Sequence, residues 1–134
     1  MKNKLVFCTL FDHNYMARGI SLYHSLERNC KNFELWVIAM SDICEQALKK
    51  MNLENIKIVS LTDFEDDELL KAKKTRSQVE YFWTLTPSIP LYVLKKNPGL
   101  KMVTYVDADL YFFSDPKPIF EEMGDDSVLI IEHR

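Results

Sequence analysis

Two carboxylates stand one residue apart at the end of the most apolar strand predicted in this chain. Residues 102–109 read Met-Val-Thr-Tyr-Val-Asp-Ala-Asp, a run typical of a strand buried on both faces of a parallel sheet. Because burying a carboxylate is costly, Asp107 and Asp109 are expected where this strand emerges at its C-terminal end, the edge at which open α/β sheets bind ligands. Two acids there make a hard oxygen site for Mn²⁺ or Mg²⁺, with room for substrate phosphates. We therefore predict a metal–diphosphate site.

The same pair has a simpler structural interpretation. Aspartate is favoured in turns, so Asp107 and Asp109 could serve only to turn the chain out of its strand. Turn chemistry does not explain why both acids follow the most apolar strand. Either interpretation puts them at the strand end, and only the first gives them a ligand.

Composition narrows the functional classes. The 134 residues, 47% hydrophobic and 28% charged, have the values of one globular domain. The net charge is 17 − 20 = −3, which indicates neither a nucleic-acid nor an anionic-membrane partner. The only glycines are Gly19, Gly99 and Gly124, so neither a GxGxxG fingerprint nor a Walker loop can be written. A bound nucleotide would have to be held without a glycine-rich phosphate loop.

Cysteine usage gives an expectation about compartment. Cys8, Cys30 and Cys44 are odd in number and lack metal-ligand spacing, so we expect buried or idle thiols in a reducing cytoplasm. The N-terminus shows no signal-peptide core, and no apolar run approaches the length of a membrane span. We therefore predict a cytoplasmic protein without a transmembrane segment.

Strands and helices are predicted to alternate along the chain. Strands are expected at 4–10, 33–40, 56–60, 102–109 and 127–132. Helices are expected at about 15–28 and 42–51, from Thr62 onward, at 77–96, and from Ser114 to Glu122. This alternation predicts an α/β fold, a Rossmann-like three-layer domain whose sheet is mostly parallel, with the last strand parallel or antiparallel at an edge.

Local signals refine the helix boundaries. The predicted caps are Asp12 or Asn14 for the first helix, Asp42 with Glu45 for the second, and Thr62 with Glu65 for the third. Pro87 and Pro90 fall inside 77–96, and proline disrupts a helix interior. We therefore expect that helix to be interrupted.

Two parts of the chain are similar to one enzyme family. Val6-Phe7-Cys8-Thr9, then Asp12-His13-Asn14-Tyr15, then a helix with Ser25-Leu26 resembles the opening of the GT-A glycosyltransferases, especially the glycogenin and lipopolysaccharide galactosyltransferase family. Residues 104–110, followed by Ser114-Asp115-Pro116 and Ile119-Phe120, resemble that family's DxD strand and the segment after it. The similarity spans nearly the whole chain.

The resemblance implies sugar transfer from a nucleoside-diphosphate donor, a UDP-sugar foremost, with Mn²⁺ or Mg²⁺ as cofactor. It implies that 1–134 form a single GT-A donor-binding domain. Asp109 would bind the metal directly, and Asp107 would bind the metal and touch the donor ribose or sugar. The base and ribose would lie over the first strand and its turn, which makes donor-binding candidates of Thr9, Asp12, Asn14 and Tyr15. Structural alternatives stay open, because Tyr15 could be a core-facing aromatic and Asn14 a plain helix cap.

Two departures from the family pattern matter. The family's helix before the DxD strand carries Tyr-x-Arg with the arginine facing the donor, whereas here the stretch is Tyr81-Phe82-Trp83. Arg76 could replace that arginine for the donor, or could be a solvated helix end. The family's third metal ligand, a histidine, and its acceptor-binding part fall beyond residue 134, so the chain is either part of a longer protein or a minimal relative. His133 is a further candidate near the same edge, or incidental.

Other classes fit the acids less well. A haloacid-dehalogenase-like phosphatase also places Asp-x-Asp after an apolar strand, but it needs Thr or Val two residues after the second acid, where Tyr111 stands. A non-enzymatic receiver-like signalling module needs an acidic pair after the first strand, and Asp12 has no acidic neighbour. Both remain alternatives to the glycosyltransferase.

Overall fold

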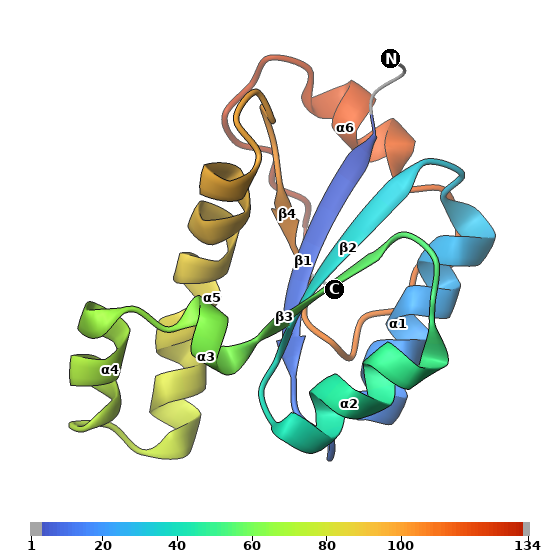
Figure 1. Cartoon of the computed structure of the whole chain (residues 1–134). Helices are drawn as coiled ribbons and strands as arrows, with labels where there is room; N and C mark the ends of the chain where they lie inside the picture. Colours follow the sequence, from blue (N-terminus) through green and yellow to red (C-terminus); the bar gives the residue numbers. More distant parts are fainter. Residues whose placement is uncertain (1–3, 133–134) are drawn as a thin grey trace.

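A parallel sheet with helices on both faces forms the body of the protein. In the computed structural model, which describes residues 4–132, the strands are β1 (Leu5–Phe11), β2 (Phe33–Ala39), β3 (Ile56–Ser60) and β4 (Thr104–Tyr105). They are hydrogen-bonded in the order β3-β2-β1-β4, and every neighbouring pair is parallel (Figure 1). The predicted α/β class with a parallel sheet is confirmed.

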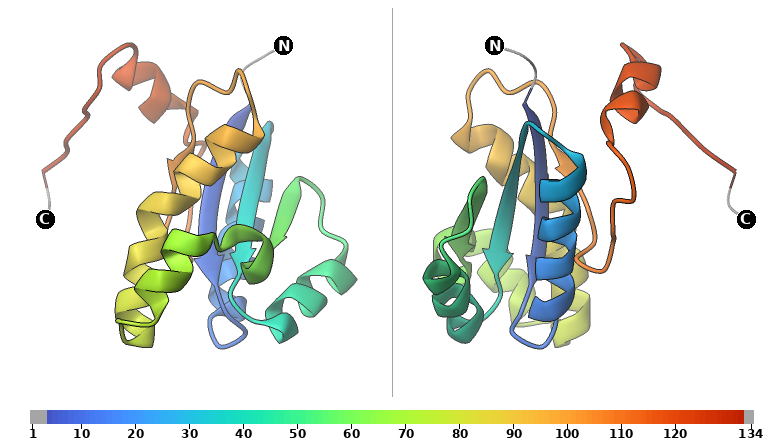
Figure 2. Two further views of the ribbon diagram at one scale, coloured as in Figure 1. Left: turned by 60° about the vertical axis from the view of Figure 1, so that its left-hand side comes forward. Right: turned by 90° about the vertical axis from the view of Figure 1, so that its right-hand side faces the viewer.

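Helices connect the strands and cover the sheet. They are α1 (Met16–Asn29), α2 (Asp42–Met51), α3 (Leu61–Phe64), α4 (Asp67–Lys73), α5 (Gln78–Lys96) and α6 (Lys117–Met123). Figure 2 shows α1 against one face of the sheet and α5 against the other, which is the expected three-layer arrangement. Within residues 4–132, none of these helices combines the length and the apolar character needed to cross a membrane.

The alternation of side chains along β1 divides the core into two layers. Phe7 and Phe11 pack into the cluster that contains buried residues of α1 and α2. Val6 and Cys8 pack into the other cluster, together with Leu85 and its neighbours on α5. Because β1 is central, both faces of the strand are buried, and this explains its continuous apolar sequence.

Gly19 on α1 allows the end of β1 to pack tightly. The residue is buried, and a Cβ atom at this position would overlap the aromatic ring of Phe11, the last residue of β1. The close approach needs a residue without a side chain. Gly19 therefore fixes how α1 lies against the strand end from which the first turn departs.

The expectation that helix 77–96 is interrupted is wrong. α5 runs without a break from Gln78 to Lys96 with Pro87 and Pro90 inside it. Two interior prolines cost about 6 kcal/mol in helix propensity, whereas four fully buried apolar side chains contribute about 6–12 kcal/mol. Those side chains recur every fourth residue and face the sheet: Tyr81, Leu85, Ile89 and Val93. Tertiary burial thus holds the helix together against its local propensity.

Helix caps differ from the predicted ones by a few residues. The caps that the structure shows are Ser41 for α2, Ser60 for α3, Asp66 for α4 and Ser77 for α5. The predicted helices at 42–51 and after residue 60 form, but Asp42 and Thr62 are not their caps. The true capping box is Ser77 with Glu80, in which each side chain bonds the other residue's backbone N–H.

The C-terminal part of the chain has less regular structure than expected. The strand predicted at 102–109 is paired only at Thr104 and Tyr105, and one further bond joins the Val106 N–H to the Cys8 carbonyl at 3.0 Å. The strand predicted at 127–132 is absent, and the apolar side chains of this segment are exposed (Ile130, 85%). A strand sequence needs an edge to pair with, and this segment pairs with none in residues 4–132.

Candidate functional site

Asp107 and Asp109 leave β4 with both carboxylates exposed. They alternate with Val106 and Ala108, whose side chains are buried in the core. The Leu110 N–H donates to the Asp107 carbonyl at 3.1 Å, which closes a turn around Asp109. The turn that the simpler interpretation of Asp107 and Asp109 predicted is therefore present. It also brings both acids to the surface at the strand end, as a ligand site requires.

The two acids lie at the same edge of the sheet as the first turn. β4 runs parallel to β1, with Thr104 beside Phe7 and Tyr105 beside Cys8. Two residues after Tyr105 the chain reaches Asp107, and four residues after Cys8 it reaches Asp12. Parallel neighbours end at a common edge, so the turn after β1 and the acids after β4 share the carboxyl edge of the sheet (Figure 1).

Tyr105 connects Asp107 to helix α5. Burial is the main cause that raises the pKa of Tyr105 to about 12; a hydrogen bond with Thr86 opposes this rise, and the negative charge of Asp107 and a hydrogen bond with it add to it. The phenol therefore keeps its proton at neutral pH and can donate it to the carboxylate. Tyr105 was not predicted as a site residue from the sequence. Its position two residues before Asp107, on the same face of the strand, was the signal that could have indicated this contact.

Asp12 organises the turn between β1 and α1. Its Oδ1 accepts hydrogen bonds from the backbone N–H groups of Asn14 (2.9 Å) and Tyr15 (3.1 Å), and the Asn14 side-chain amide lies 3.3 Å from Oδ2. This is an Asx turn. The predicted helix cap is wrong, because α1 begins after Tyr15 without a side-chain cap. Asp12 and Asn14 are therefore held in place by each other beside the carboxyl edge.

Tyr15 does not face the core, so that structural alternative is wrong. Its side chain is 46% exposed, and the guanidinium of Arg18 lies 4.7 Å from the centre of its ring. The two residues are three apart across the start of α1, a spacing that brings side chains together on a helix. Arg18 was not predicted from the sequence, and the spacing from Tyr15 was the signal that could have indicated it.

Thr9 differs from the other predicted donor-binding residues. It is completely buried within β1, and its hydroxyl is the one buried side-chain polar atom without a partner in residues 4–132. An unsatisfied buried hydroxyl costs about 1–3 kcal/mol. The structure does not bring Thr9 to the surface with Asp12 and Tyr15.

Arg76 lies on the surface just before α5. Its guanidinium donates to the Thr84 hydroxyl, and it lines an open cavity of about 580 Å³ together with Thr75, Glu80 and Trp83. The α5 N-terminus is at the end of the molecule where β1 terminates (Figure 1). Arg76 is thus exposed, as expected if it is a solvated helix end. It also lies at the end of the molecule where a donor-binding arginine would be needed.

The acids after β4 fit a hard divalent cation. Magnesium is commonly bound through one or two carboxylates, with substrate phosphates and water completing the shell. Asp107 and Asp109 supply two such ligands, and the described residues 4–132 contain no group of three His, Cys, Asp or Glu side chains that could hold a metal ion, at this edge or at any other place. No hydrogen bond or ion pair within that range engages Asp109. His133, the further candidate, lies outside the described residues.

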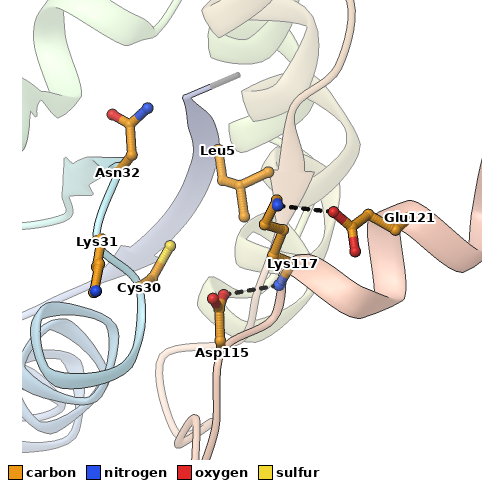
Figure 3. A pocket seen from close by; sticks show the side chains of 7 residues that line it. All are labelled: Leu5, Cys30, Lys31, Asn32, Asp115, Lys117 and Glu121. Carbon is orange, nitrogen blue, oxygen red and sulfur yellow. Dashed lines mark hydrogen bonds and ion pairs between the residues drawn. The ribbon is translucent and has the colours of Figure 1, made fainter. Parts of the chain in front are cut away.

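A second cavity lies at the opposite, amino edge of the sheet. It has a volume of about 590 Å³, and its lining residues are Leu5, Cys30, Lys31, Asn32, Asp115, Lys117 and Glu121 (Figure 3). The Lys117 ammonium pairs with Glu121 at 2.8 Å, and the Lys117 N–H donates to Asp115 at 3.0 Å. Its acids therefore already have partners within the chain, and this edge is not where open α/β sheets bind ligands.

Cys8 and Cys44 line neither cavity, whereas Cys30 borders the cavity at the amino edge. All three are buried free thiols, as predicted. Burial raises the pKa of Cys8 to about 12 and that of Cys44 to about 11. A thiol with such a pKa is neutral at physiological pH and a poor nucleophile.

The chain is similar in sequence to two proteins of Bacillus subtilis (strain 168). It is 36% identical to the uncharacterized protein YfnF over 124 residues, and 34% identical to the uncharacterized protein YfnD over 128 residues. The alignments cover 92% and 96% of this chain and 41% of each relative. The chain thus spans about two fifths of the length of these relatives. No family model matches it.

Solved structures of glycosyltransferases share its fold. The active-site mutant Q189E of LgtC superposes with a TM-score of 0.56 at 16% identity, covering 87% of this chain and 42% of LgtC. The galactosyltransferase LgtC in complex with donor and acceptor sugar analogs gives 0.55 over the same coverage. The apo bifunctional glycosyltransferase WbbM gives 0.54 at 15% identity, covering 90% of this chain and 21% of WbbM. The chain therefore has the fold of the GT-A glycosyltransferases.

Proposed function

We propose that this chain carries the donor-binding and metal-binding site of a glycosyltransferase that moves a sugar from a nucleoside diphosphate to an acceptor. The observation that carries the proposal is the pair of exposed carboxylates, Asp107 and Asp109, at the carboxyl edge of β4 in a GT-A fold. The proposal includes a UDP-sugar as the donor and the cytoplasm as the compartment, which the free buried thiols favour.

In this proposal each acid has a distinct task. Asp109, which has no partner within residues 4–132, would bind Mn²⁺ or Mg²⁺ directly. Asp107 would bind the same ion while its other contact, the Tyr105 hydroxyl, fixes its orientation. When bound, the ion supplies Lewis-acid stabilisation of the leaving diphosphate. The acids themselves do not act as a glycosidase pair, because they leave one strand side by side and do not face each other across a bond.

The first turn would bind the nucleoside. Asp12 and Asn14 are held in one geometry by their mutual hydrogen bonds, so binding there would require little ordering. Tyr15 presents an exposed ring that Arg18 supports, which suits stacking of a base. Arg76 at the start of α5 would contribute positive charge toward the donor diphosphate.

A thermal-shift experiment tests the proposal. The chain is heated with UDP, GDP, CDP and their sugar conjugates, each with and without Mn²⁺. A ligand at a hundred times its dissociation constant should raise the free energy of unfolding by about 2.7 kcal/mol. We expect this stabilisation only when metal and nucleotide are both present.

Two variants show where the ligand binds. Asp109→Ala should lose the metal-dependent shift and keep the fold, because the side chain is exposed. Asp115→Ala removes an exposed acid at the amino edge and should retain the shift. A shift that needs no metal, that persists in Asp109→Ala, or that disappears in Asp115→Ala would contradict the proposal.

A further inference from the structure

The outer side of helix α5 carries an apolar stripe that the core does not use. The buried residues of α5 recur at every fourth position against the sheet, and a second set of apolar residues lies two positions away from them. Residues two apart on a helix point about 200° apart, so the second set faces away from the sheet. We call this set the outer ridge, and its members are Val79, Trp83, Pro87 and Leu91. In the left view of Figure 2, α5 lies in front of the sheet.

The outer ridge is continuous and is left open to solvent by the described residues 4–132. Val79 is 57% exposed, Trp83 is 70% exposed and Leu91 is 52% exposed. Side chains four residues apart are neighbours on a helix surface, and the ridge from Val79 to Leu91 spans about 18 Å. A helix that is apolar on two opposite sides usually buries both of them. The outer ridge therefore has the character of a contact surface.

The charge of the chain is distributed unevenly around this ridge. Residues 71–101, which contain α5 and its flanks, include seven lysines and arginines and one acid, a net charge of +6. The rest of the chain has ten lysines and arginines and nineteen acids, a net charge of −9, so the two parts add to the −3 of the whole. The overall charge, which by itself indicates no anionic partner, thus hides a strongly cationic stretch.

Cations lie beyond both ends of the outer ridge. Lys74 and Arg76 come just before α5, and Lys95 and Lys96 are its last two residues. All four residues are exposed. In the part of the chain that the structure describes, 4–132, no ion pair engages Lys74 or Lys95, and the Lys96 ammonium lies 5.4 Å from the centre of the Tyr92 ring. These positive charges are therefore available to an anionic surface.

Part of the negative charge beside the ridge is already compensated. Glu80 is the one acid on α5, and hydrogen bonds with the Ser77 hydroxyl and backbone, followed by the charge of Arg76, lower its pKa. Two acids that precede α5 are paired with lysines: Glu65 with Lys73 at 2.9 Å and Glu68 with Lys71 at 2.7 Å. These acids therefore oppose the attraction of an anion less than their number suggests.

We infer that the outer ridge docks on the surface of a bilayer that contains anionic lipids. Tryptophan favours the boundary between water and hydrocarbon, and the apolar face of a helix can lie about 5–10 Å deep there. The stems of the flanking lysines would lie along the apolar surface while their ammonium groups reach the lipid phosphates. The contact runs along the membrane, since no helix within residues 4–132 could cross it. The inference does not depend on the proposed sugar transfer.

Two other anionic partners share only part of this chemistry. A nucleic acid would use the cations and leave Val79 and Leu91 exposed. An acidic protein would need carboxylates at fixed positions opposite long, flexible lysine side chains, whereas lipid head groups move laterally and can gather around them. A bilayer surface accommodates both the ridge and the cations, and the experiment distinguishes the other two partners from it.

Sedimentation of the full chain with sucrose-loaded vesicles tests the inference. One set of vesicles contains phosphatidylcholine alone, and the other contains equal parts of phosphatidylcholine and phosphatidylglycerol. We expect the chain to bind the anionic vesicles more tightly, by about fivefold for each cation that reaches the surface, equivalent to about 1 kcal/mol. The fluorescence of Trp83 should shift to shorter wavelength on binding, and Trp83→Phe should lose this shift although Trp36 remains.

Matched variants locate the contact. Trp83→Ala should weaken binding to the anionic vesicles about tenfold, whereas Ile43→Ala, at an exposed apolar position on α2, should leave it nearly unchanged. Lys95→Gln should weaken binding about fivefold, and Lys50→Gln, at an exposed lysine on α2, should not. All four positions are exposed, so the fold should tolerate these changes.

The results that would overturn the inference are distinct. The inference is wrong if the chain stays in solution with anionic vesicles, if it binds neutral and anionic vesicles equally, or if Trp83→Ala binds as well as the unchanged chain. Polyuridylic acid and polyglutamate serve as the nucleic-acid and acidic-protein probes. Binding of either probe that is lost in Trp83→Ala and Lys95→Gln, without binding to vesicles, would assign the ridge to that partner instead.

Discussion

The two edges of the sheet differ in how their charges are satisfied. An open cavity of about 590 Å³ lies at the amino edge, and the other cavity, of about 580 Å³, lies on the surface at the start of α5 without any lining residue from β1, β4 or the turns that follow them. At the amino edge, Glu121 pairs with Lys117 and Asp115 accepts a backbone N–H, so the acids are compensated within the chain. At the carboxyl edge, Asp109 has no such partner within residues 4–132.

This difference shows that cavity volume alone does not identify the functional edge. An acid that is already paired has little remaining electrostatic free energy to give to a ligand, whereas an unpaired carboxylate attracts a cation. Strand direction adds a second asymmetry, because chain segments leave all parallel strands at the carboxyl edge and can bring distant residues together. Both effects favour the edge that holds Asp107 and Asp109.

The largest effect is expected from a change in the packing beneath the carboxyl edge. Gly19→Leu places a side chain where the Phe11 ring lies. The free energy of unfolding should therefore fall by about 3 kcal/mol, the upper end of the usual cost of overpacking. Ser21→Leu adds the same side chain at an exposed position of α1 and should change stability by less than about 0.5 kcal/mol. Chemical denaturation measures both. Equal stability of the two variants would show that Gly19 does not position the strand end.

A smaller effect is expected from the residue that orients Asp107. Tyr105→Phe removes the hydroxyl shared with Asp107 and Thr86 while keeping the buried ring. Loss of an outer partner of a metal ligand typically weakens metal affinity about 10–100-fold. Titration with Mn²⁺ in the presence of nucleotide should show this loss, and Tyr111→Phe, at an exposed tyrosine, should not. Unchanged affinity in Tyr105→Phe would mean that Asp107 needs no support from this hydroxyl.

The smallest effects concern pH, and they should have opposite signs at the two edges. The Ser77 hydrogen bonds lower the pKa of Glu80 below its usual 4.5, so the stabilisation of the α5 cap is present above that value and is lost as the pH falls through the folded-state pKa. A hydrogen bond with Glu121, followed by its charge, raises the pKa of Lys117 above 10.5. The stabilisation of α6 is therefore present below 10.5 and is lost as the pH rises through the folded-state value.

Residue-specific chemical shifts during a pH titration measure these two transitions. The Ser77 amide signal should change on acidification, and Glu80→Gln should remove that change. The signals of the Lys117 side chain should change in alkali, as its ammonium group loses its proton. A change at Ser77 that persists in Glu80→Gln would show that another acid controls the start of α5.

Much of the fold could be predicted because its signals are local. The first three strands alternate with helices in the sequence, and β1, β2 and β3 form at 5–11, 33–39 and 56–60, close to the predicted ranges. The errors occurred where tertiary packing outweighs local preference. α5 continues through Pro87 and Pro90 because its buried face holds it, and 127–132 remain unpaired because a strand needs a neighbouring edge.

The candidate site shows the same limit. The sequence indicated the acids Asp107 and Asp109, since two carboxylates after an apolar run are conspicuous wherever they fold. It gave no means of seeing that Thr9 is buried, that Tyr15 is exposed, or that Trp83 lies in a cavity. Burial depends on which elements pack around a residue, and the residue's own neighbours in the sequence do not specify this.

The sequence by itself determined the alternation of the first three strands with helices, the parallel sheet and the residues that would stand at the end of β4. Residue type and periodicity are sufficient for these, because apolar side chains on one face recur about every 3.6 residues in a helix and every 2 residues in a strand. Only the tertiary structure decided which acids are compensated and which are not. Charge compensation depends on distances between residues far apart in the chain, such as Tyr105 with Thr86, and those distances exist only after the sheet has formed.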